Sequence, residues 1–175
     1  ETEDIAAMGT TQIKALTSSQ LAAMTTDQVQ AIETDDISSL NTLAVRGFTT
    51  EGIAALTTDQ VANLTTAEIK GLTTAQIAAI ETDDIQALTT TQVKFLTTAQ
   101  LVAMETDQIA ALTTEQVGAL TSVQVSKLTT DQIAAIETED IAAMGTVQIK
   151  ALTSTQTAAL TTDQVQAIET GDIAS

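Results

Sequence analysis

The sequence predicts an all-α solenoid, a superhelix of very short helices with one helix in each eight-residue repeat and about 3.4 repeats in each turn. The chain is written as 21 complete octads of the form T-T-x-Q-[IV]-x-A-[LIM], followed by a 22nd octad that stops one residue short at Ser175. Aliphatic residues recur three apart within the octad, and charged octads recur every three or four octads. Short repeats of fixed period are typical of solenoids, in which each unit packs on its neighbours.

Positions 5 and 8 of the octad form the predicted core. Position 5 is Ile, Val or Leu in every octad except the one that has Thr157, and position 8 is apolar in all 21 octads that reach it. Residues three apart lie on the same side of a helix. Because 8 is not a multiple of 3.6, a continuous helix would turn this apolar face away from the core. The helix must therefore break in every octad.

The start of each helix is predicted by a capping box. In residues 56–61, with the sequence L-T-T-D-Q-V, an apolar residue precedes Thr57, and Gln60 and an aliphatic residue follow. In this arrangement the Thr hydroxyl accepts from the backbone three residues on, and the Gln side chain reaches back to the cap. Position 2, which is Thr or Ser in every octad, is a competing cap. With either cap, we expect a helix of about five or six residues in each octad.

A slower rhythm of charge predicts the length of a superhelical turn. Glu stands at position 1 of octads 1, 5, 11, 14, 18 and 22, and Lys or Arg lies in octads 2, 6, 9, 12, 16 and 19. Residues 1–38 recur, slightly altered, as residues 137–174, which is 17 octads later. Five short intervals fit into 17 octads, so each spans about 3.4 octads or about 27 residues. Charges at such intervals mark one face of the superhelix, as apolar residues do on an ordinary helix.

Composition excludes several classes of function. The chain has no Cys, His, Trp or Tyr, and its net charge is −17. Without thiol or imidazole groups the usual catalytic constellations and soft metal sites are missing, so we expect that the protein is not an enzyme. Its acidity argues against nucleic acid as a partner. The apolar runs are too short for membrane insertion.

No Pro-, Gly- or Ser-rich linker interrupts the register, which predicts a single domain over residues 1–175. The first octad begins in full register and the last stops inside the repeat. Neither end has the polar capping unit that free-standing solenoids need. We therefore expect the chain to be a fragment of a longer array.

The acidic octads have two interpretations. Five of the six octads that begin with Glu have Asp at position 4, where the Thr octads mostly have Gln. Carboxylates from successive turns would suit Ca²⁺ as a bound cation. Alternatively, they form a solvated row at helix N-termini, which the helix dipole favours; we favour this second interpretation and predict no cofactor. The candidate Ca²⁺ ligands are Glu33, Asp35, Asp36, Glu81, Asp83, Asp84, Glu137, Glu139 and Asp140.

The adjoining side of the superhelix carries cations together with unusual apolar residues. Exposed apolar strips mark interfaces, so this side is a candidate surface for self-association or a lateral protein contact. Alternatively, the cations only dilute the acidic charge, and the two Phe residues fill gaps in the core. The candidate lateral interface consists of Lys14, Arg46, Phe48, Lys70, Lys94, Phe95, Val123, Lys127, Val147 and Lys150.

The repeat resembles a known kind of protein. Runs such as AMTTDQVQAIETDDI at 23–37 and ALTTEQVGALTSVQV at 111–125 resemble the repetitive tracts of very large bacterial surface or secreted proteins of the adhesin and haemagglutinin-like exoprotein kind. The resemblance covers the whole chain and implies an extracellular stalk, spacer or fibre-forming segment. It carries over no site residue. The alternative function is a binding module that holds Ca²⁺, a protein or a glycan on the acidic or Lys-bearing stripe.

Overall fold

The computed structural model describes residues 1–168 of the chain. The chain divides into two compact units, Glu1–Leu88 and Thr89–Ser175. In the second unit the described residues are 89–168. The expectation of one continuous domain over residues 1–175 stays a prediction.

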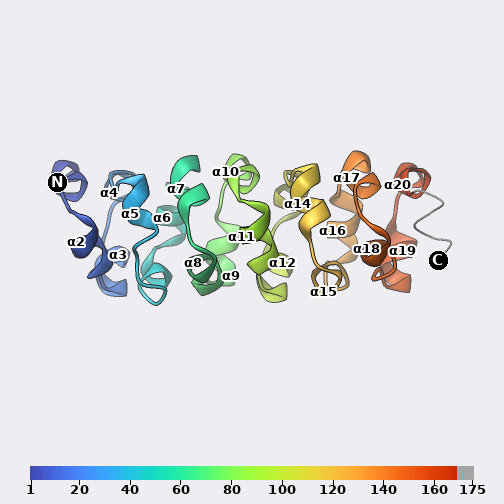
Figure 1. The fold of residues 1–175 in the computed structure, drawn as a ribbon, viewed down its shortest axis with the longest axis horizontal. Coiled ribbons are helices and arrows are strands. Elements are labelled where there is room, and N and C mark those ends of the chain that lie inside the picture. The colour runs from blue at the N-terminus through green and yellow to red at the C-terminus, as the bar shows by residue number, and fades with distance from the viewer. Residues whose placement is uncertain (169–175) are drawn as a thin grey trace. The chain divides into compact units, whose positions relative to one another are not determined.

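Every described octad builds one short helix, as the sequence predicts (Figure 1). In the first unit one octad forms a 3₁₀ helix, η1, and the others form α-helices of four to six residues. The elements are α1 Thr2–Ala6, α2 Thr10–Lys14, α3 Ser18–Ala22, α4 Thr26–Gln30, α5 Thr34–Ile37, η1 Val45–Gly47, α6 Thr50–Ala54, α7 Thr58–Asn63, α8 Thr66–Gly71, α9 Thr74–Ala78 and α10 Thr82–Ala87.

The described part of the second unit contains α-helices alone. They are α11 Thr90–Phe95, α12 Thr98–Ala103, α13 Thr106–Ala110, α14 Thr114–Ala119, α15 Ser122–Val125, α16 Thr130–Ala135, α17 Thr138–Ala142, α18 Thr146–Ile149, α19 Ser154–Ala159 and α20 Thr162–Ala167. The all-α fold class is therefore confirmed.

Position 1 of the octad is the N-cap, and position 2 is the first helical residue. In α7, Thr57 has extended backbone, with φ −77° and ψ 156°. Its hydroxyl accepts from the backbone N–H of Gln60 at 3.2 Å, and its own N–H donates to Oε1 of Gln60 at 2.9 Å. This reciprocal pair is the predicted capping box, and it decides between the two competing caps.

The six-residue helices have their C-cap at position 8, where the chain returns to extended backbone. Leu64 closes α7 with φ −59° and ψ 133°, and its N–H donates to the carbonyl oxygen of Val61. Because Leu64 and Thr65 are both extended, the chain turns the corner there and α8 begins at Thr66. No residue in the described part of the chain has a positive φ. The corner therefore needs neither glycine nor proline.

Helices three octads apart stack on one another. In the first unit α2 packs on α5, α4 on α6 and α7 on α10; in the second, α11 packs on α14, α13 on α16 and α17 on α20 (Figure 1). Corresponding residues in these pairs are 24 apart in sequence. This spacing is inconsistent with an ordinary helical hairpin solenoid, in which it would be 16. The predicted superhelix of short helices is confirmed, with stacked helices three octads apart rather than two.

Positions 5 and 8 line the interior of both units, as predicted. Every position-5 side chain from Ile13 to Ile141 is buried, and so is every position-8 side chain from Ile32 to Met144. Each buried aliphatic side chain contributes about 1.5 to 3 kcal/mol through removal from water. An isolated octad has no neighbours to cover these groups, so the fold exists only as an array.

The octad at residues 41–48 departs from the pattern. Asn41 stands at position 1, where its Oδ1 accepts from the N–H of Leu43 at 2.8 Å, and the 3₁₀ helix η1, with Ala44 as its N-cap, replaces the α-helix. A Cβ on Gly47 would clash with the backbone of Ser18, one turn away. The turns therefore approach more closely here than an alanine would allow.

Candidate interaction surfaces

Glutamine at position 4 joins successive turns. Besides completing its own capping box, buried Gln60 donates from Nε2 to the carbonyl oxygens of Val29 at 3.1 Å and Ile32 at 2.7 Å. These acceptors are positions 5 and 8 of the octad four earlier. Carbonyl groups at the end of a helix have no partner within that helix. One side chain therefore satisfies both the start of its own helix and the end of another.

The same register recurs wherever such a bond is described. Nε2 donates to the carbonyl groups 31 and 28 residues earlier at 2.6 to 3.1 Å. We call these residues the glutamine ladder. Its members are Gln60, Gln76, Gln124, Gln132, Gln148, Gln156 and Gln164.

The octad pattern predicted only the capping role of position 4 and not this second, inter-turn role. The available signal was the choice of amide over acid. A capping box accepts either Gln or Glu, yet position 4 is Gln in 14 octads and Glu in one. A carboxylate has no N–H to donate. That bias indicates that the side chain must donate as well as accept.

At two of the Asp residues that stand in place of Gln, a different bond joins the turns. Asp36 is buried, and its Oδ1 accepts from the hydroxyl of Thr10 at 2.6 Å. Thr10 stands at position 2 of the octad three earlier. Asp84 is bonded in the same way by the hydroxyl of Thr58. The hydroxyl groups of position 2 therefore serve as inter-turn donors.

Burial governs the ionisation of Asp84. Removal from water raises the pKa of its carboxyl group, and the negative charges of Glu81 and Asp83 raise the pKa further. The hydrogen bond from Thr58 opposes the shift and lowers the pKa. The neutral acid is therefore easier to form at Asp84 than at an exposed aspartate.

The candidate Ca²⁺ ligands fall into two groups with different surroundings. Asp36, Asp84 and Asp140 at position 4 are buried. The position-1 and position-3 acids, which are Glu33, Asp35, Glu81, Asp83, Glu137 and Glu139, are exposed. Within residues 1–168 no three acidic side chains form a group that could hold a metal ion. Because the Asp side chains are buried, their carboxylates do not lie on the exposed surface that carries the other acidic side chains of the same octads.

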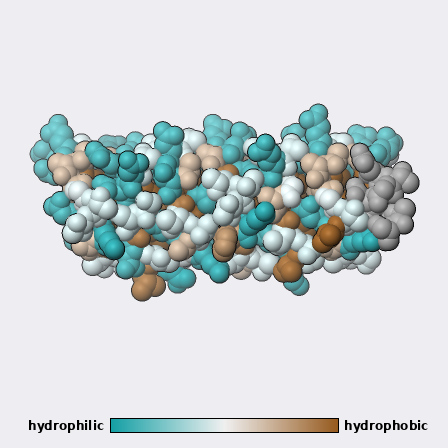
Figure 2. Space-filling view, in the orientation of Figure 1, coloured by the Kyte–Doolittle hydropathy of each residue, from teal (hydrophilic) through white to brown (hydrophobic). Residues whose placement is uncertain are grey.

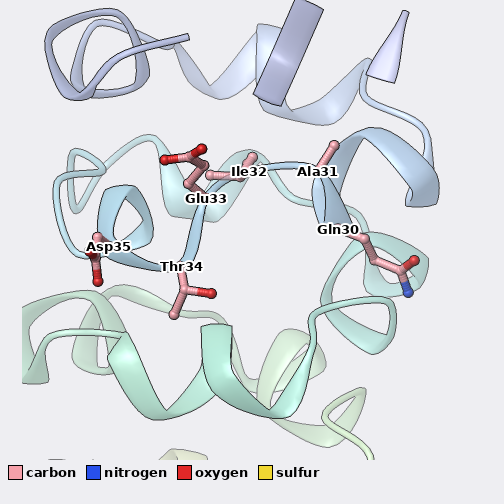
Figure 3. Close-up of a pocket in the computed structure, with 6 residues that line it drawn as sticks. All are labelled: Gln30, Ala31, Ile32, Glu33, Thr34 and Asp35. Carbon is pink, nitrogen blue, oxygen red and sulfur yellow. The ribbon is translucent and has the colours of Figure 1, made fainter. Parts of the chain in front are cut away.

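A concavity of about 490 Å³ lies beside the acidic octad at 33–40 and is lined by residues 30–35. The carboxylates of Glu33 and Asp35 point in different directions there (Figure 3). A similar concavity of about 480 Å³ is lined in part by Glu137 and Glu139. The carboxylates of Figure 3 do not converge on one point, whereas the ligands of a Ca²⁺ site must.

Most of the candidate lateral interface lies at the surface. Each of its five lysines is exposed, and none forms an ion pair with another described residue. Its apolar members are also accessible, with Phe95 49 %, Val123 61 % and Val147 70 % exposed. Leu43, at 73 %, is a further exposed apolar residue. On the face shown in Figure 2, apolar side chains stand in separate groups among polar ones.

Two members of the candidate interface are engaged inside the first unit. Phe48 occupies position 8 and is buried in the core, so its inclusion in an exposed surface was wrong. Position 8 is a core position of the octad, and the aromatic side chain of Phe48 is buried there as the aliphatic side chains are in other octads. Arg46 donates from Nε to the carbonyl oxygen of Gly71 at 2.8 Å, which ties η1 to α8.

The octad pattern matches a family model described as the ALTTAQ repeat, over residues 1–31, 29–66, 77–114, 102–135 and 133–170. The chain belongs to the ALTTAQ repeat family. The letters A-L-T-T-A-Q correspond to positions 7, 8, 1, 2, 3 and 4. The ALTTAQ motif thus contains the core residue, the cap, the inter-turn hydroxyl and the ladder glutamine. The search of curated proteins gave no match. No helix in residues 1–168 has both the length and the apolar character of a membrane span.

Proposed function

We propose that this ALTTAQ repeat is a non-enzymatic structural module, a spacer within a large bacterial protein that is secreted or displayed at the cell surface. The observation that carries the proposal is the repeated core: within each unit, the same two positions are buried in octad after octad. The ladder adds a second, recurring connection between turns. Nothing in the composition supplies a nucleophile of the thiol type or an imidazole base.

A length series tests the spacer role. Because residues 137–174 nearly repeat residues 1–38, a second copy of residues 1–136 inserted before Glu137 keeps native-like junctions. Five added turns should lengthen the particle by about 45 to 50 Å, at about 9 to 10 Å per layer of packed helices. Small-angle X-ray scattering measures the maximum dimension. An unchanged dimension would contradict a spacer whose length follows its repeat number.

The location of the parent protein needs a separate experiment. Antibodies raised against this segment should label intact cells of the encoding bacterium, or its culture medium, without permeabilisation. Labelling confined to permeabilised cells would contradict the surface or secreted assignment and leave the spacer role standing.

A lateral contact is a second candidate function, favoured by the unpaired lysines and the exposed Phe95, Val123 and Val147. If copies associate through this side, Val123→Ser combined with Val147→Ser should weaken association in sedimentation velocity. Val102→Ser, at another exposed apolar residue, is the control. If the protein stays a monomer at all concentrations, self-association through this side is excluded.

A Ca²⁺ titration followed by Tm tests the cation alternative, since a ligand at 100 times its Kd adds about 2.7 kcal/mol to the free energy of unfolding.

A further inference from the structure

Glu68 in α8 is the one glutamic acid at position 4 of the octads. Its side chain is 1 % exposed. Oε2 accepts from the N–H of Thr65 at 2.6 Å, as Oε1 of a ladder glutamine does in its own capping box. The other oxygen, Oε1, is buried and makes no hydrogen bond. A buried polar atom without a partner is costly and calls for an explanation.

The register of the ladder indicates what Oε1 faces. In every described ladder bond the amide nitrogen Nε2 of the glutamine donates to the carbonyl groups 31 and 28 residues earlier. In Glu68 the oxygen Oε1 takes the place of that nitrogen. For Glu68 these carbonyl groups belong to Ile37 and Leu40, the ends of the octad that contains α5. An ionised Oε1 has only lone pairs to offer to carbonyl oxygens, so the contact is repulsive. A protonated carboxyl group has an O–H that can donate.

We propose that Glu68 carries a proton in the folded protein and donates it from Oε1 to the carbonyl oxygen of Ile37 or Leu40, as a proton-operated latch between the octads at 65–72 and 33–40. The latch is independent of the spacer role. The neutral acid replaces one of the two N–H groups of a ladder glutamine and leaves the core unchanged.

No counter-ion accounts for a buried carboxylate here. On η1, which packs against α8, Arg46 is committed to the carbonyl oxygen of Gly71. On α8 itself, Lys70 is exposed. Burial raises the pKa of Glu68, and hydrogen bonds from Thr65 act against that rise. No charged group contributes to the shift, so the pKa rise is a desolvation effect.

The acidic residues of α5 do not provide a counter-ion for Glu68 either. Asp36 is bonded to the hydroxyl of Thr10, and Asp35 is exposed. Their negative charges can only disfavour an ionised Glu68 nearby. The groups that face Glu68 from its own helix and its neighbours therefore favour the neutral form.

The latch lies in a stretch of the chain where glutamine is scarce at position 4. Position 4 is Asp36, Ala44 and Gly52 in the three octads from 33 to 56. Within residues 33–72, Gln60 is therefore the one described residue of the glutamine ladder, and Glu68 stands at position 4 of the octad that follows. Loss of the Glu68 proton should loosen this segment before the rest of the chain.

The sign of the pH dependence follows from the raised pKa. Between the ordinary pKa of a glutamic acid, about 4.3, and the higher pKa in the folded state, the folded protein binds more protons than the unfolded chain. Stability therefore falls as pH rises through this window and is constant above it. Glu68→Gln should abolish this loss because an amide does not ionise.

Urea unfolding of the whole chain from pH 4 to pH 9 tests the latch. The midpoint difference between Glu68→Gln and the wild type should be small at pH 4, widen as pH rises and then level off. Glu115→Gln makes the same charge change at an exposed site and should run parallel to the wild type. A difference for Glu68→Gln that does not change with pH would overturn the proposal.

A direct titration gives a second readout. In a ¹³C NMR titration the Glu68 carboxyl should change at a pH above the ordinary pKa of a glutamic acid, about 4.3. Hydrogen exchange, corrected for intrinsic rates, should lose protection in residues 33–72 as Glu68 ionises, while residues 113–152 keep theirs. Titration of Glu68 at the ordinary pKa of a glutamic acid would overturn the proposal even if both variants fold normally.

Discussion

The two units keep the same core but differ in how evenly glutamine occupies position 4. From Thr89 to residue 168, position 4 is Gln in every octad except the one with Asp140. In Glu1–Leu88 it is also Asp, Ala, Gly or Glu. Positions 5 and 8 are buried across the interior of both. The comparison shows that the core defines the fold and that the ladder is a second, separable layer of stabilisation.

Where the first unit lacks a ladder glutamine, other contacts join the turns. Asp36 accepts from Thr10, and Arg46 donates to the carbonyl oxygen of Gly71. Close approach at Gly71 accompanies the second contact. Each substitute is a single bond, whereas Gln60 makes bonds to more than one carbonyl group. We therefore expect the first unit to depend more on individual residues than the second.

The largest expected effect is on the shared core. Ile77→Asp should lower the free energy of unfolding by about 4 kcal/mol or more, because it removes a buried aliphatic side chain and buries an unpaired acid. Ala75→Asp, at exposed position 3, should change it by under about 0.5 kcal/mol. Circular dichroism in urea measures both. Equal losses would refute the assignment of interior and exterior positions.

Removal of one ladder residue should have the next largest effect. Gln124→Ala leaves the carbonyl groups of Val93 and Leu96 without this donor and should cost about 2 to 3 kcal/mol. Gln20→Ala is the matched control, since exposed Gln20 makes its capping-box bonds and no described inter-turn bond. Its cost should stay under about 1 kcal/mol. Similar costs would mean that position 4 acts through capping alone.

The same glycine-to-alanine change should have opposite signs in the two units. A Cβ on Gly71 would lie 2.8 Å from the carbonyl oxygen of Thr42, so Gly71→Ala should cost about 1 to 2 kcal/mol. The nearest atom to a Cβ on Gly118 is the carbonyl oxygen of Ala143 at 3.5 Å, an ordinary contact. Gly118→Ala should stabilise the protein by about 0.5 to 1 kcal/mol, because alanine favours a helix. Thermal unfolding of both variants checks the pair; stabilisation by Gly71→Ala would contradict the close approach.

The smallest expected effect is a gain from extending the ladder. Gly52→Gln places an amide where the register points to the carbonyl groups of Leu21 and Met24, and it should add about 1 kcal/mol. The site is tight, since a Cβ would lie 3.3 Å from Oγ1 of Thr49. Gly52→Ala supplies the helix preference without the amide. If Ala stabilises as much as Gln in urea unfolding, the ladder does not extend to this octad.

Local features of this fold could be predicted from the sequence because each depends on residues within a single octad. The aliphatic residues at 5 and 8, and the Thr and Gln of the capping box, lie within eight residues of one another. The slower charge rhythm correctly predicted that helices about three octads apart, rather than two, pack on one another. These predictions needed only helical periodicity and capping chemistry.

The ladder and the details of the surface were harder to predict. A bond from Gln60 to Ile32 spans 28 residues, and its acceptors are backbone carbonyls that leave no mark in the sequence. The 3₁₀ helix at Val45–Gly47 depends on contact with Ser18 in another turn. Phe48 was assigned to the surface because of the charge on its octad, whereas its position in the octad places it in the core.

The central claim is that a position-4 glutamine binds the octad four before its own. Nuclear Overhauser measurements on ¹⁵N-labelled protein test it most directly. The side-chain amide protons of Gln124 and Gln132 should show cross-peaks to residues 93–96 and 101–104, which are 28 to 31 earlier. Cross-peaks to residues 16 earlier would indicate two octads per turn and contradict the account.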